Sequence, residues 1–234
     1  MSRHMNRFDL TGYTILPAVV GAEVVASLIE ALASIGGDAA VRARDDRVYA
    51  VRNLMSLSPA VRQLAVSPQL RAVVEPLAGR GACVVRAILF DKSADANWKV
   101  AWHQDLSIAV KARIDVPGFG PWSVKSGVVH VQPPVELLQR MLTLRLHLDD
   151  CTDQNGPLRV KPESHQHGVL SSGALDAWRD MPERLCLVPA GGVVLMRPLL
   201  LHASSSAAAI GHRRVIHLEW SADHLPGGLR WAEE

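Results

Sequence analysis

Two segments in which apolar and polar residues alternate strictly constrain the fold more than any other feature of this sequence. Alternation with a period of two is typical of β-strands that have two different faces. Residues 141–150 place four leucines on one face, and residues 213–220 place Arg214, Ile216, Leu218 and Trp220 on one face. The opposite faces carry Thr143, Arg145, His147 and Asp149 in the first segment, and Arg213, Val215, His217 and Glu219 in the second. Such strands fit either a sandwich with a solvated outer side or a barrel with a polar lumen and a covered outer face.

The rest of the chain predicts helices first and strands afterwards. Residues 22–35 carry apolar side chains at helical spacing, and Ser58-Pro59 and Ser67-Pro68 each resemble an N-cap followed by proline at the first helical position. From residue 82 onward, β-branched and apolar residues predict strands over 83–90 and an extended segment over 98–108.

These patterns predict one domain over residues 1–234, mainly β with N-terminal helices. Residues 1–80 would form the helical support, and residues 81–222 an antiparallel core of jelly-roll or barrel type. Residues 109–134 are dense in glycine and proline and have little periodicity, which indicates a lid-like loop. A short helix is expected over residues 134–140.

Composition excludes several classes of partner. The 25 Lys and Arg residues nearly balance the 23 Asp and Glu residues, for a formal net charge of +2, so a dedicated nucleic-acid binder is not expected. No apolar run approaches the roughly 18 residues of a membrane span, so no membrane partner is expected either. Three widely spaced cysteines without a C-x-x-C pair favour a reducing, cytoplasmic location. The oligomeric state stays open.

The chain has ten histidines, and one of them lies in a pattern that suits a metal ion. His103 and Asp105 are two residues apart on an expected strand, so both side chains would project from the same face. A further histidine would complete a 2-His-1-carboxylate facial triad, which typically holds Fe(II) in non-haem oxygenases. However, His147 and Asp149 have the same spacing, and a solvated strand face is the alternative for either pair.

Two residues near the C-terminal end add to this hypothesis. His202 follows the apolar run 199–201, where burial of an imidazole without a partner would be costly. A satisfied core histidine is the alternative for this residue. Arg213 lies on the polar face of its strand, and a guanidinium is a natural partner for a dicarboxylate because it binds carboxylates in a bidentate manner. Its alternative is an exposed strand arginine.

In this order, the motifs resemble the phytanoyl-CoA dioxygenase family from about Leu89 to Trp220. They are Trp102-His103-Gln104-Asp105, Asn155-Gly156-Pro157-Leu158-Arg159-Val160 with Ser164-His165, His202-Ala203-Ser204, and Arg213. The resemblance implies an Fe(II)- and 2-oxoglutarate-dependent oxygenase on a double-stranded β-helix of the cupin-like, jelly-roll type.

The resemblance also implies roles for individual residues. His103, Asp105 and His202 would be the catalytic iron ligands, and Arg213 would bind the distal carboxylate of 2-oxoglutarate with help from Ser204. Arg214 is on the opposite, apolar face and is the weaker candidate for that role. Two more cofactor contacts are expected from the polar face of residues 141–150, namely Thr143 and Arg145. On this comparison, His147 and Asp149 become residues of the lumen or its surroundings.

The expected reaction is hydroxylation of a C–H bond, or another oxidation, in a small organic substrate. Related halogenases replace the carboxylate ligand with a small residue, whereas Asp105 is intact. Dioxygen would be consumed, and succinate and CO2 released. No feature of the sequence is specific for CoA. In the segment 111–132, Trp122 and Lys125 could face the substrate, although a solvated loop is the alternative.

Two other functions remain open from the sequence. A catalytically inactive, cupin-like small-molecule binding protein would share the fold, and a zinc- or manganese-dependent hydrolase could use the same triad. The chain also departs from the family at Pro162-Glu163-Ser164-His165, where the family usually has glycine before Ser-His. This change affects a backbone position that would be left-handed, which glycine adopts most easily.

Overall fold

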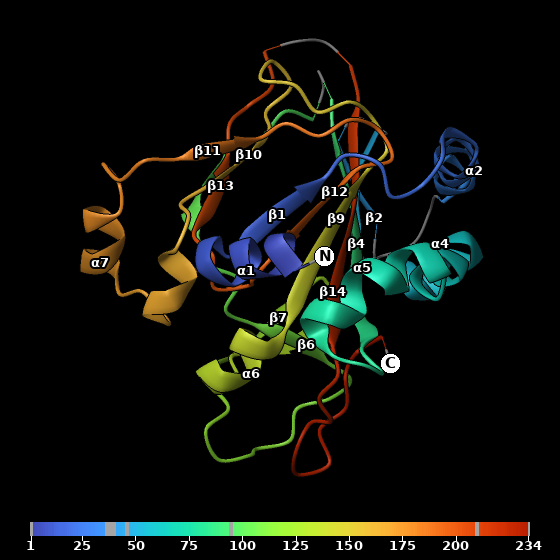
Figure 1. Ribbon diagram of the computed structural model, residues 1–234. Coiled ribbons are helices and arrows are strands. Elements are labelled where there is room, and N and C mark those ends of the chain that lie inside the picture. Colours follow the sequence, from blue (N-terminus) through green and yellow to red (C-terminus); the bar gives the residue numbers. More distant parts are fainter. Residues whose placement is uncertain (1, 36–40, 45–46, 94–95, 209–210, 234) are drawn as a thin grey trace.

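The computed structural model describes residues 2–35, 41–44, 47–93, 96–208 and 211–233, and its strands form three sheets in which the neighbouring strands are antiparallel (Figure 1). The large sheet has the spatial order β1 (Tyr13–Leu16), β12 (Val193–Met196), β9 (Leu142–His147), β14 (Arg213–Ser221), β4 (Cys83–Lys92), β3 (Arg47–Val51) and β2 (Val41–Arg44). The small sheet has the order β11 (Arg184–Cys186), β10 (Leu158–Val160), β13 (His202–Ser204) and β5 (Val100–His103). The third sheet has the order β6 (Ile108–Val110), β8 (Val128–Val131) and β7 (Trp122–Lys125).

The helices lie mainly at the N-terminal end of the chain and between strands. They are α1 (Ser2–Thr11), α2 (Ala22–Ala33), α3 (Leu54–Leu57), α4 (Pro59–Ala65), α5 (Pro68–Ala78), α6 (Val135–Arg140), α7 (Ser172–Ala177) and the 3-10 helix η1 (Ser164–His167). Among the residues described, no helix combines the length and the apolar character that crossing a membrane requires.

The two alternating segments form β9 and β14, which are neighbours near the centre of the large sheet. Their apolar faces pack on α2, α4 and α5, through side chains that include Leu144, Ile216 and Leu28. Figure 1 shows these helices on one side of the large sheet and the small sheet on the other. The polar faces are buried as well, between the two sheets. Of the two arrangements that the alternation allowed, the structure therefore has the polar lumen with a covered outer face.

The helix signals in the first eighty residues are confirmed. Ser58 and Ser67 cap α4 and α5, because the hydroxyl of each accepts the backbone N–H three residues later, at 3.3 and 3.4 Å. Proline occupies the first position of both helices, where its missing N–H costs nothing. The segment 134–140 is also helical as predicted, as α6.

Strands in the N-terminal region were not predicted. β1 extends the large sheet by pairing with β12, and β3 pairs with β4 through Ala50 and Val51. These strands are four and five residues long, too short for their pattern to be distinct, and tertiary pairing decides their conformation. Residues 1–80 therefore supply sheet edges in addition to helices.

The expectation of an irregular loop over 109–134 is wrong for much of that segment. β7 and β8 form a hairpin, and β8 also pairs with β6. The turn between β7 and β8 is Ser126-Gly127, with φ angles of 50° and 76°. Positive φ at both central residues is typical of a two-residue turn whose twist matches the twist of the hairpin strands. The Ser-Gly dipeptide was the sequence signal for this turn.

Candidate metal centre

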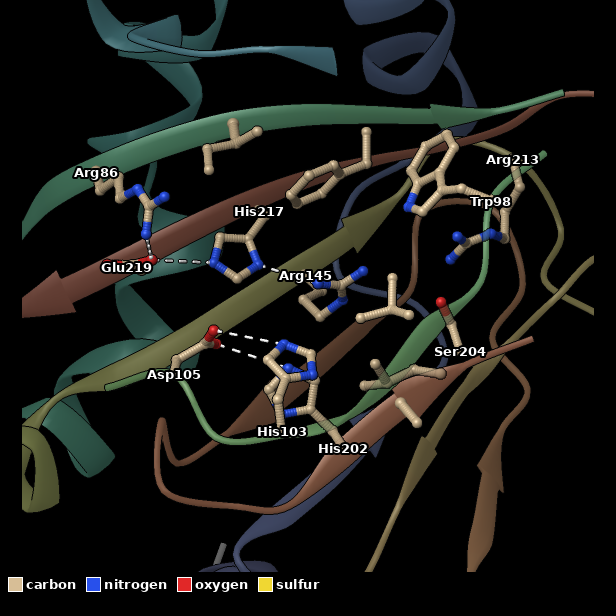
Figure 2. A pocket seen from close by; sticks show the side chains of 15 residues that line it. Arg86, Trp98, His103, Asp105, Arg145, His202, Ser204, Arg213, His217 and Glu219 are labelled. Carbon is tan, nitrogen blue, oxygen red and sulfur yellow. Dashed lines mark hydrogen bonds and ion pairs between the residues drawn. The ribbon is translucent and has the colours of Figure 1, made fainter. Parts of the chain in front are cut away.

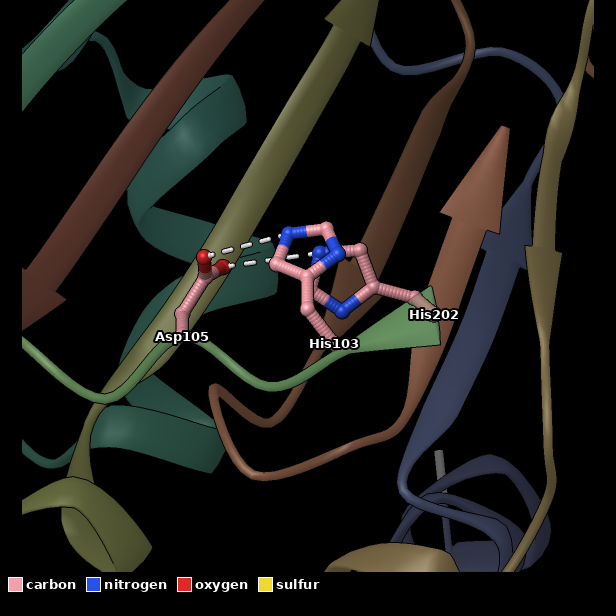
Figure 3. A group of neighbouring side chains, drawn as sticks. All are labelled: His103, Asp105 and His202. Carbon is pink, nitrogen blue, oxygen red and sulfur yellow. Dashed lines mark ion pairs between the residues drawn. The ribbon is translucent and has the colours of Figure 1, made fainter. Parts of the chain in front are cut away.

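His103, Asp105 and His202 meet at one end of the lumen (Figure 3). His103 is the last residue of β5 and His202 the first of β13, and the two are cross-strand partners. Their Nε2 atoms lie 3.9 and 3.7 Å from the two carboxylate oxygens of Asp105. The ring centroids are 4.1 Å apart. Among the described residues, these three side chains form the group of His, Cys, Asp or Glu residues whose ligand atoms lie close enough together to hold one metal ion.

Each histidine is oriented by its own strand. Nδ1 of His103 donates to the carbonyl of Ala101 at 2.9 Å, and Nδ1 of His202 donates to the carbonyl of Leu200 at 2.8 Å. A proton held at Nδ1 leaves the lone pair of Nε2 free to bind a metal ion, and the same contact fixes the ring orientation. Both lone pairs are directed toward Asp105.

Asp105 reaches the centre by a different route from the predicted one. β5 ends at His103, so Asp105 does not project from the strand. Its backbone N–H donates to the carbonyl of Pro198 at 2.9 Å, which draws the chain out of the sheet. The side chain of Gln104 holds this bend, because it donates to the carbonyl of Leu199 at 2.7 Å and accepts from the N–H of Leu170 at 2.8 Å. A loop, rather than strand alternation, therefore places this carboxylate beside the imidazoles.

The charges of the three side chains suit a divalent cation. Burial alone would raise the pKa of Asp105, but His202, His217, His103 and Arg86 together outweigh it and lower the pKa to about 2. Burial is also the main cause that lowers the pKa of His202 to about 4. At neutral pH the carboxylate is therefore ionised and this imidazole neutral.

One carboxylate oxygen of Asp105 is left without a hydrogen-bond donor in the described part of the chain. The Oδ2 atom of Asp105 is buried and accepts no hydrogen bond among the described residues. A buried, charged oxygen of this kind is costly unless it binds a cation. Two imidazole nitrogens and one carboxylate are the donor set of a non-haem Fe(II) site. The residues present thus fit an iron ion.

The lumen beside this centre contains a cavity of about 130 Å³ (Figure 2). Side chains of β4, β9 and β14 form one wall, and side chains of β5, β10 and β13 form the other. The candidate metal centre lies at one end. At the other end, Figure 2 shows Arg213, Ser204 and Trp98.

A chain of polar contacts crosses the wall formed by the large sheet. Arg86 donates to Glu219 at 2.8 Å, and His217 donates from Nε2 to the same carboxylate at 3.3 Å. Arg145 donates to Nδ1 of His217 at 3.0 Å. Burial alone would raise the pKa of Glu219, but Arg86 and His217 lower it, so the carboxylate stays ionised.

The remaining predicted site residues divide between the lumen and its surroundings. Arg213 is buried and lines the cavity together with Ser204 and Arg145. Thr143 is fully buried on the same sheet face, opposite Glu219, but does not reach the cavity wall. Arg214 does not line the cavity and pairs with Asp149 instead.

The second His-x-Asp pair, His147 and Asp149, has surroundings that differ from those of His103 and Asp105. Arg214 donates to Asp149 through two side-chain nitrogens, at 2.6 and 2.9 Å, and through its backbone N–H at 2.7 Å. His147 is fully buried, and neither ring nitrogen has a partner among the residues described. Asp149 and His147 therefore do not form a second metal centre.

Sequence reasoning missed Arg86 and Lys92 on β4. Arg86, Ile88 and Phe90 all line the cavity, which is the period-two pattern of a strand face. Lys92 continues that face and is buried. The basic residues at the two ends of this apolar stretch were the available signal.

The turn that departs from the expected glycine keeps its left-handed backbone. Glu163 has a φ angle of 71°, which costs a non-glycine residue about 1 kcal/mol. Ser164 follows it, and its hydroxyl donates to the carbonyl of Lys161 at 2.7 Å and accepts from the N–H of Leu201 at 2.8 Å. This turn therefore fixes the backbone immediately before His202.

Comparison with known proteins gives one family and one fold. Residues 8–215 match the family model described as Phytanoyl-CoA dioxygenase (PhyH). Over 173 residues the chain is 25% identical to ectoine dioxygenase of Sphingopyxis alaskensis, an alignment that covers 70% of this chain. The chain spans 50% of the length of that relative.

Two solved structures show the fold. The structure of EctD from S. alaskensis with 2-oxoglutarate and 5-hydroxyectoine has a TM-score of 0.74 and 22% identity, over 95% of this chain and 76% of that chain. The non-heme alpha ketoglutarate dependent epimerase SnoN from nogalamycin biosynthesis has a TM-score of 0.66 and 22% identity, over 97% of this chain and 90% of that chain. These likenesses confirm the predicted cupin-like jelly-roll fold.

Proposed function

The chain belongs to the phytanoyl-CoA dioxygenase family, and from this premise we propose that it is a non-haem Fe(II)- and 2-oxoglutarate-dependent oxygenase. The observation that carries the proposal is the buried Oδ2 atom of Asp105, which accepts no hydrogen bond among the described residues, with the Nε2 atoms of two histidines close to its carboxylate. We treat residues 1–234 as one catalytic domain, in which the helices of residues 1–80 support the jelly-roll core of residues 81–222.

Each site residue has a distinct task in this proposal. His103, Asp105 and His202 would hold Fe(II), and a set of three protein ligands leaves coordination positions free for co-substrate and dioxygen. Arg213 binds the distal carboxylate of 2-oxoglutarate, and Ser204 donates a hydrogen bond to it. Arg145 contacts the co-substrate from the cavity wall, whereas Thr143 acts only by supporting that wall.

When bound, the ion would let dioxygen act as the oxidant, so that one 2-oxoglutarate, one dioxygen and one substrate C–H bond would give succinate, CO2 and a substrate C–OH group. The protein holds its ligands ready for the ion, because Asp105 is ionised and His202 neutral at neutral pH. No proton then has to leave either group when the metal binds. The apolar packing behind β9 and β14 excludes water from the back of the site.

The substrate is proposed to be a small organic molecule with a C–H bond that becomes hydroxylated. An intact carboxylate ligand, Asp105, supports oxygen transfer over halogenation. The hairpin of β7 and β8 is proposed as the substrate-facing lid, with Trp122 on the first strand and Lys125 at its end. Lys125 donates to Ser107, two residues after Asp105 in the chain, at 3.2 Å.

Anaerobic titration with Fe(II) and 2-oxoglutarate tests the function directly. We expect a weak visible charge-transfer band from the chelate in the wild-type protein, and its loss in His202→Ala. Succinate release in air, dependent on an added organic substrate, would then identify the substrate by screening. A folded, metal-loaded protein that shows neither the band nor 2-oxoglutarate binding would support a binding protein or a hydrolase instead.

A further inference from the structure

Two buried cations face each other at the end of the lumen away from the metal centre. Lys92 of β4 and Arg213 of β14 are direct cross-strand partners, and their exposed fractions are 1% and 3%. Like charges in this position repel each other, and a buried cation without a counter-charge is costly. Among the described residues, no carboxylate lies within ion-pair distance of either group.

The carboxylates of the lumen are committed elsewhere. Asp105 belongs to the metal centre, and Glu219 accepts from Arg86 and His217. The end of the cavity that holds Arg213 and Ser204 therefore has an excess of positive charge. An anion that enters there would neutralise it.

The contacts of Lys92 show how its charge acts on the cavity. Its Nζ donates to the hydroxyl oxygen of Ser204 at 3.3 Å and to the carbonyl of Ser205 at 2.5 Å, and it lies 5.4 Å from the ring centroid of Trp98. An ammonium group can only donate. The Ser204 hydroxyl thus accepts on the side of Lys92 and keeps its own proton for a group in the cavity.

We propose that Lys92 is a positioning residue that fixes Ser204 as a hydrogen-bond donor and, with Arg213, makes this end of the cavity selective for a 2-oxo acid with a second, distal carboxylate. This inference rests on the proposed function, because it concerns the same co-substrate site. It assigns to Lys92 the task of discriminating 2-oxoglutarate from 2-oxo acids of the same length that end in a methyl group.

The turn between β9 and β10 is shaped around the ammonium group. A Cβ atom on Gly156 would lie 3.1 Å from Nζ of Lys92 and 2.5 Å from the carbonyl oxygen of Ser205. The glycine of the Asn155-Gly156 turn is therefore the residue that leaves room for Lys92 and its acceptor. A lysine that only filled space would not need such a close approach.

The ionisation of Lys92 supports the same role. Burial, followed by Arg213 of β14 and Arg145 of β9, lowers its pKa to about 7, while Cys151 after β9 acts weakly in the opposite direction. The other close neighbours, Ser204 and Trp98, are uncharged. A bound dicarboxylate would favour the charged ammonium, so binding above neutral pH should be accompanied by proton uptake.

The test compares two ligands in two lysine variants under anaerobic conditions with Fe(II). The ligands are 2-oxoglutarate and 2-oxopentanoate, which has a methyl group where 2-oxoglutarate has its distal carboxylate. In Lys92→Met we expect calorimetric binding of 2-oxoglutarate to weaken by about tenfold or more, because charge-assisted hydrogen bonds are lost. Binding of 2-oxopentanoate should change by less than about threefold. Lys92→Arg should keep most of the discrimination.

Lys161→Met is the matched control. Lys161 is also buried, stacks 4.8 Å from the ring centroid of Trp102 and donates to the carbonyl of Arg179 at 2.9 Å, but it lies outside the cavity. The Lys161→Met substitution should therefore leave the ratio of the affinities for 2-oxoglutarate and 2-oxopentanoate unchanged. In Ser204→Ala, the Lys92→Met change should have a smaller effect than in the wild type, since the lysine acts through Ser204.

The outcomes separate the two proposals. Equal weakening of both ligands in Lys92→Met, or no weakening, would overturn the role of Lys92 and leave the proposed function intact. Failure of the wild-type protein to bind 2-oxoglutarate would overturn the proposed function itself. Wild-type calorimetry at pH 8 in buffers of different ionisation enthalpy needs no variant. We expect net proton uptake with 2-oxoglutarate and none with 2-oxopentanoate, and equal uptake would contradict the inference.

Discussion

At the scale of single residues, the two His-x-Asp pairs show that what surrounds a carboxylate decides its role. Asp149 accepts three hydrogen bonds from Arg214, one from the backbone N–H and two from the guanidinium group, so its charge is neutralised within the protein. The Oδ2 atom of Asp105 is buried and accepts no hydrogen bond among the described residues. The spacing is identical in the two pairs, and only the three-dimensional neighbours separate a structural ion pair from a candidate metal ligand.

Substitution of the two aspartates should therefore affect different properties, Fe(II) binding for Asp105 and stability for Asp149. Asp105→Asn is expected to weaken Fe(II) binding by about 100-fold or more, because a charged ligand becomes neutral. Asp149→Asn should bind Fe(II) like the wild type but lose about 1 kcal/mol of unfolding free energy, as its pair with Arg214 is partly buried. Equilibrium dialysis and urea unfolding measure the two effects. Retention of tight iron binding in Asp105→Asn would contradict the assignment.

The adjacent arginines provide a second test of residue roles. Arg213→Ala should raise the 2-oxoglutarate concentration for half-maximal binding by about 100-fold, since a bidentate partner of the carboxylate is lost. Arg214→Ala should bind 2-oxoglutarate normally and show only a lower melting temperature. Titration with 2-oxoglutarate and thermal unfolding distinguish the variants. If the two phenotypes were exchanged, the strand register at residue 213 would be wrong by one.

At the scale of elements, the sequence predicted the strands that have two chemically distinct faces. β9 and β14 alternate over their whole length, so their existence and orientation were readable. β1 and the hairpin of β7 and β8 have short strands whose conformation depends on their partners in the sheets. The placement of Asp105 could not be predicted from the sequence. Its loop is created by hydrogen bonds from the Asp105 N–H to the carbonyl of Pro198 and from the Gln104 side chain to the next carbonyl, and both acceptors are distant in the sequence.

Lys92 illustrates the same limit within a correctly predicted strand. The pattern of residues 83–90 predicted β4, but a lysine at the end of a strand is usually solvated. Only its pairing with Arg213 and the closure of the small sheet over it make Lys92 a buried cation.

The turn before β10 allows an element-scale prediction with a matched control. Gly156 and Gly81 both have positive φ, 70° and 82°, but only Gly156 has backbone atoms close to a would-be Cβ. Gly81→Ala should cost about 1 kcal/mol of unfolding free energy from the backbone conformation alone. Gly156→Ala should cost about 3 kcal/mol, since the clash with Ser205 is added.

The two glycine variants should also differ in ligand binding. Gly156→Ala displaces the acceptor of Lys92 and should weaken 2-oxoglutarate binding, whereas Gly81→Ala should not. Urea unfolding and calorimetry report both effects. Equal destabilisation by the two changes, with equal 2-oxoglutarate affinity, would show that the turn does not support the co-substrate site.

At the scale of the whole molecule, the fold encloses ionisable groups between two sheets, and helices cover the outer face of the large sheet. Ligands and metal can compensate some of these groups, but others stay buried in every state. His147 of the large sheet is fully buried and feels the charges of Arg145 and Arg213, and His130 on β8 of the third sheet is 1% exposed. These buried imidazoles therefore tie the stability of the molecule to pH.

The direction of this dependence follows from these two histidines, and in the metal-free protein His202, whose pKa is lowered to about 4, acts in the same direction. Burial is the main cause that lowers the pKa of His130 to about 4, and burial followed by the nearby arginines lowers the pKa of His147 well below its usual value. Between about pH 6.5 and 4, the unfolded chain binds more protons than the folded protein, so unfolding free energy falls as the pH falls. Each histidine contributes up to about 1.4 kcal/mol per pH unit in that range.

We therefore expect the metal-free protein to lose stability steeply between pH 6 and pH 5, as measured by urea unfolding at constant ionic strength. His147→Leu should reduce the slope by up to about 1.4 kcal/mol per pH unit, because one buried neutral imidazole is removed. His224→Gln, at an exposed position, is the control and should keep the wild-type slope. A slope in His147→Leu equal to that of the wild type would mean that the lumen admits a proton to His147 in the folded state. The conclusion that the lumen excludes water, on which the co-substrate site depends, would then be wrong around His147.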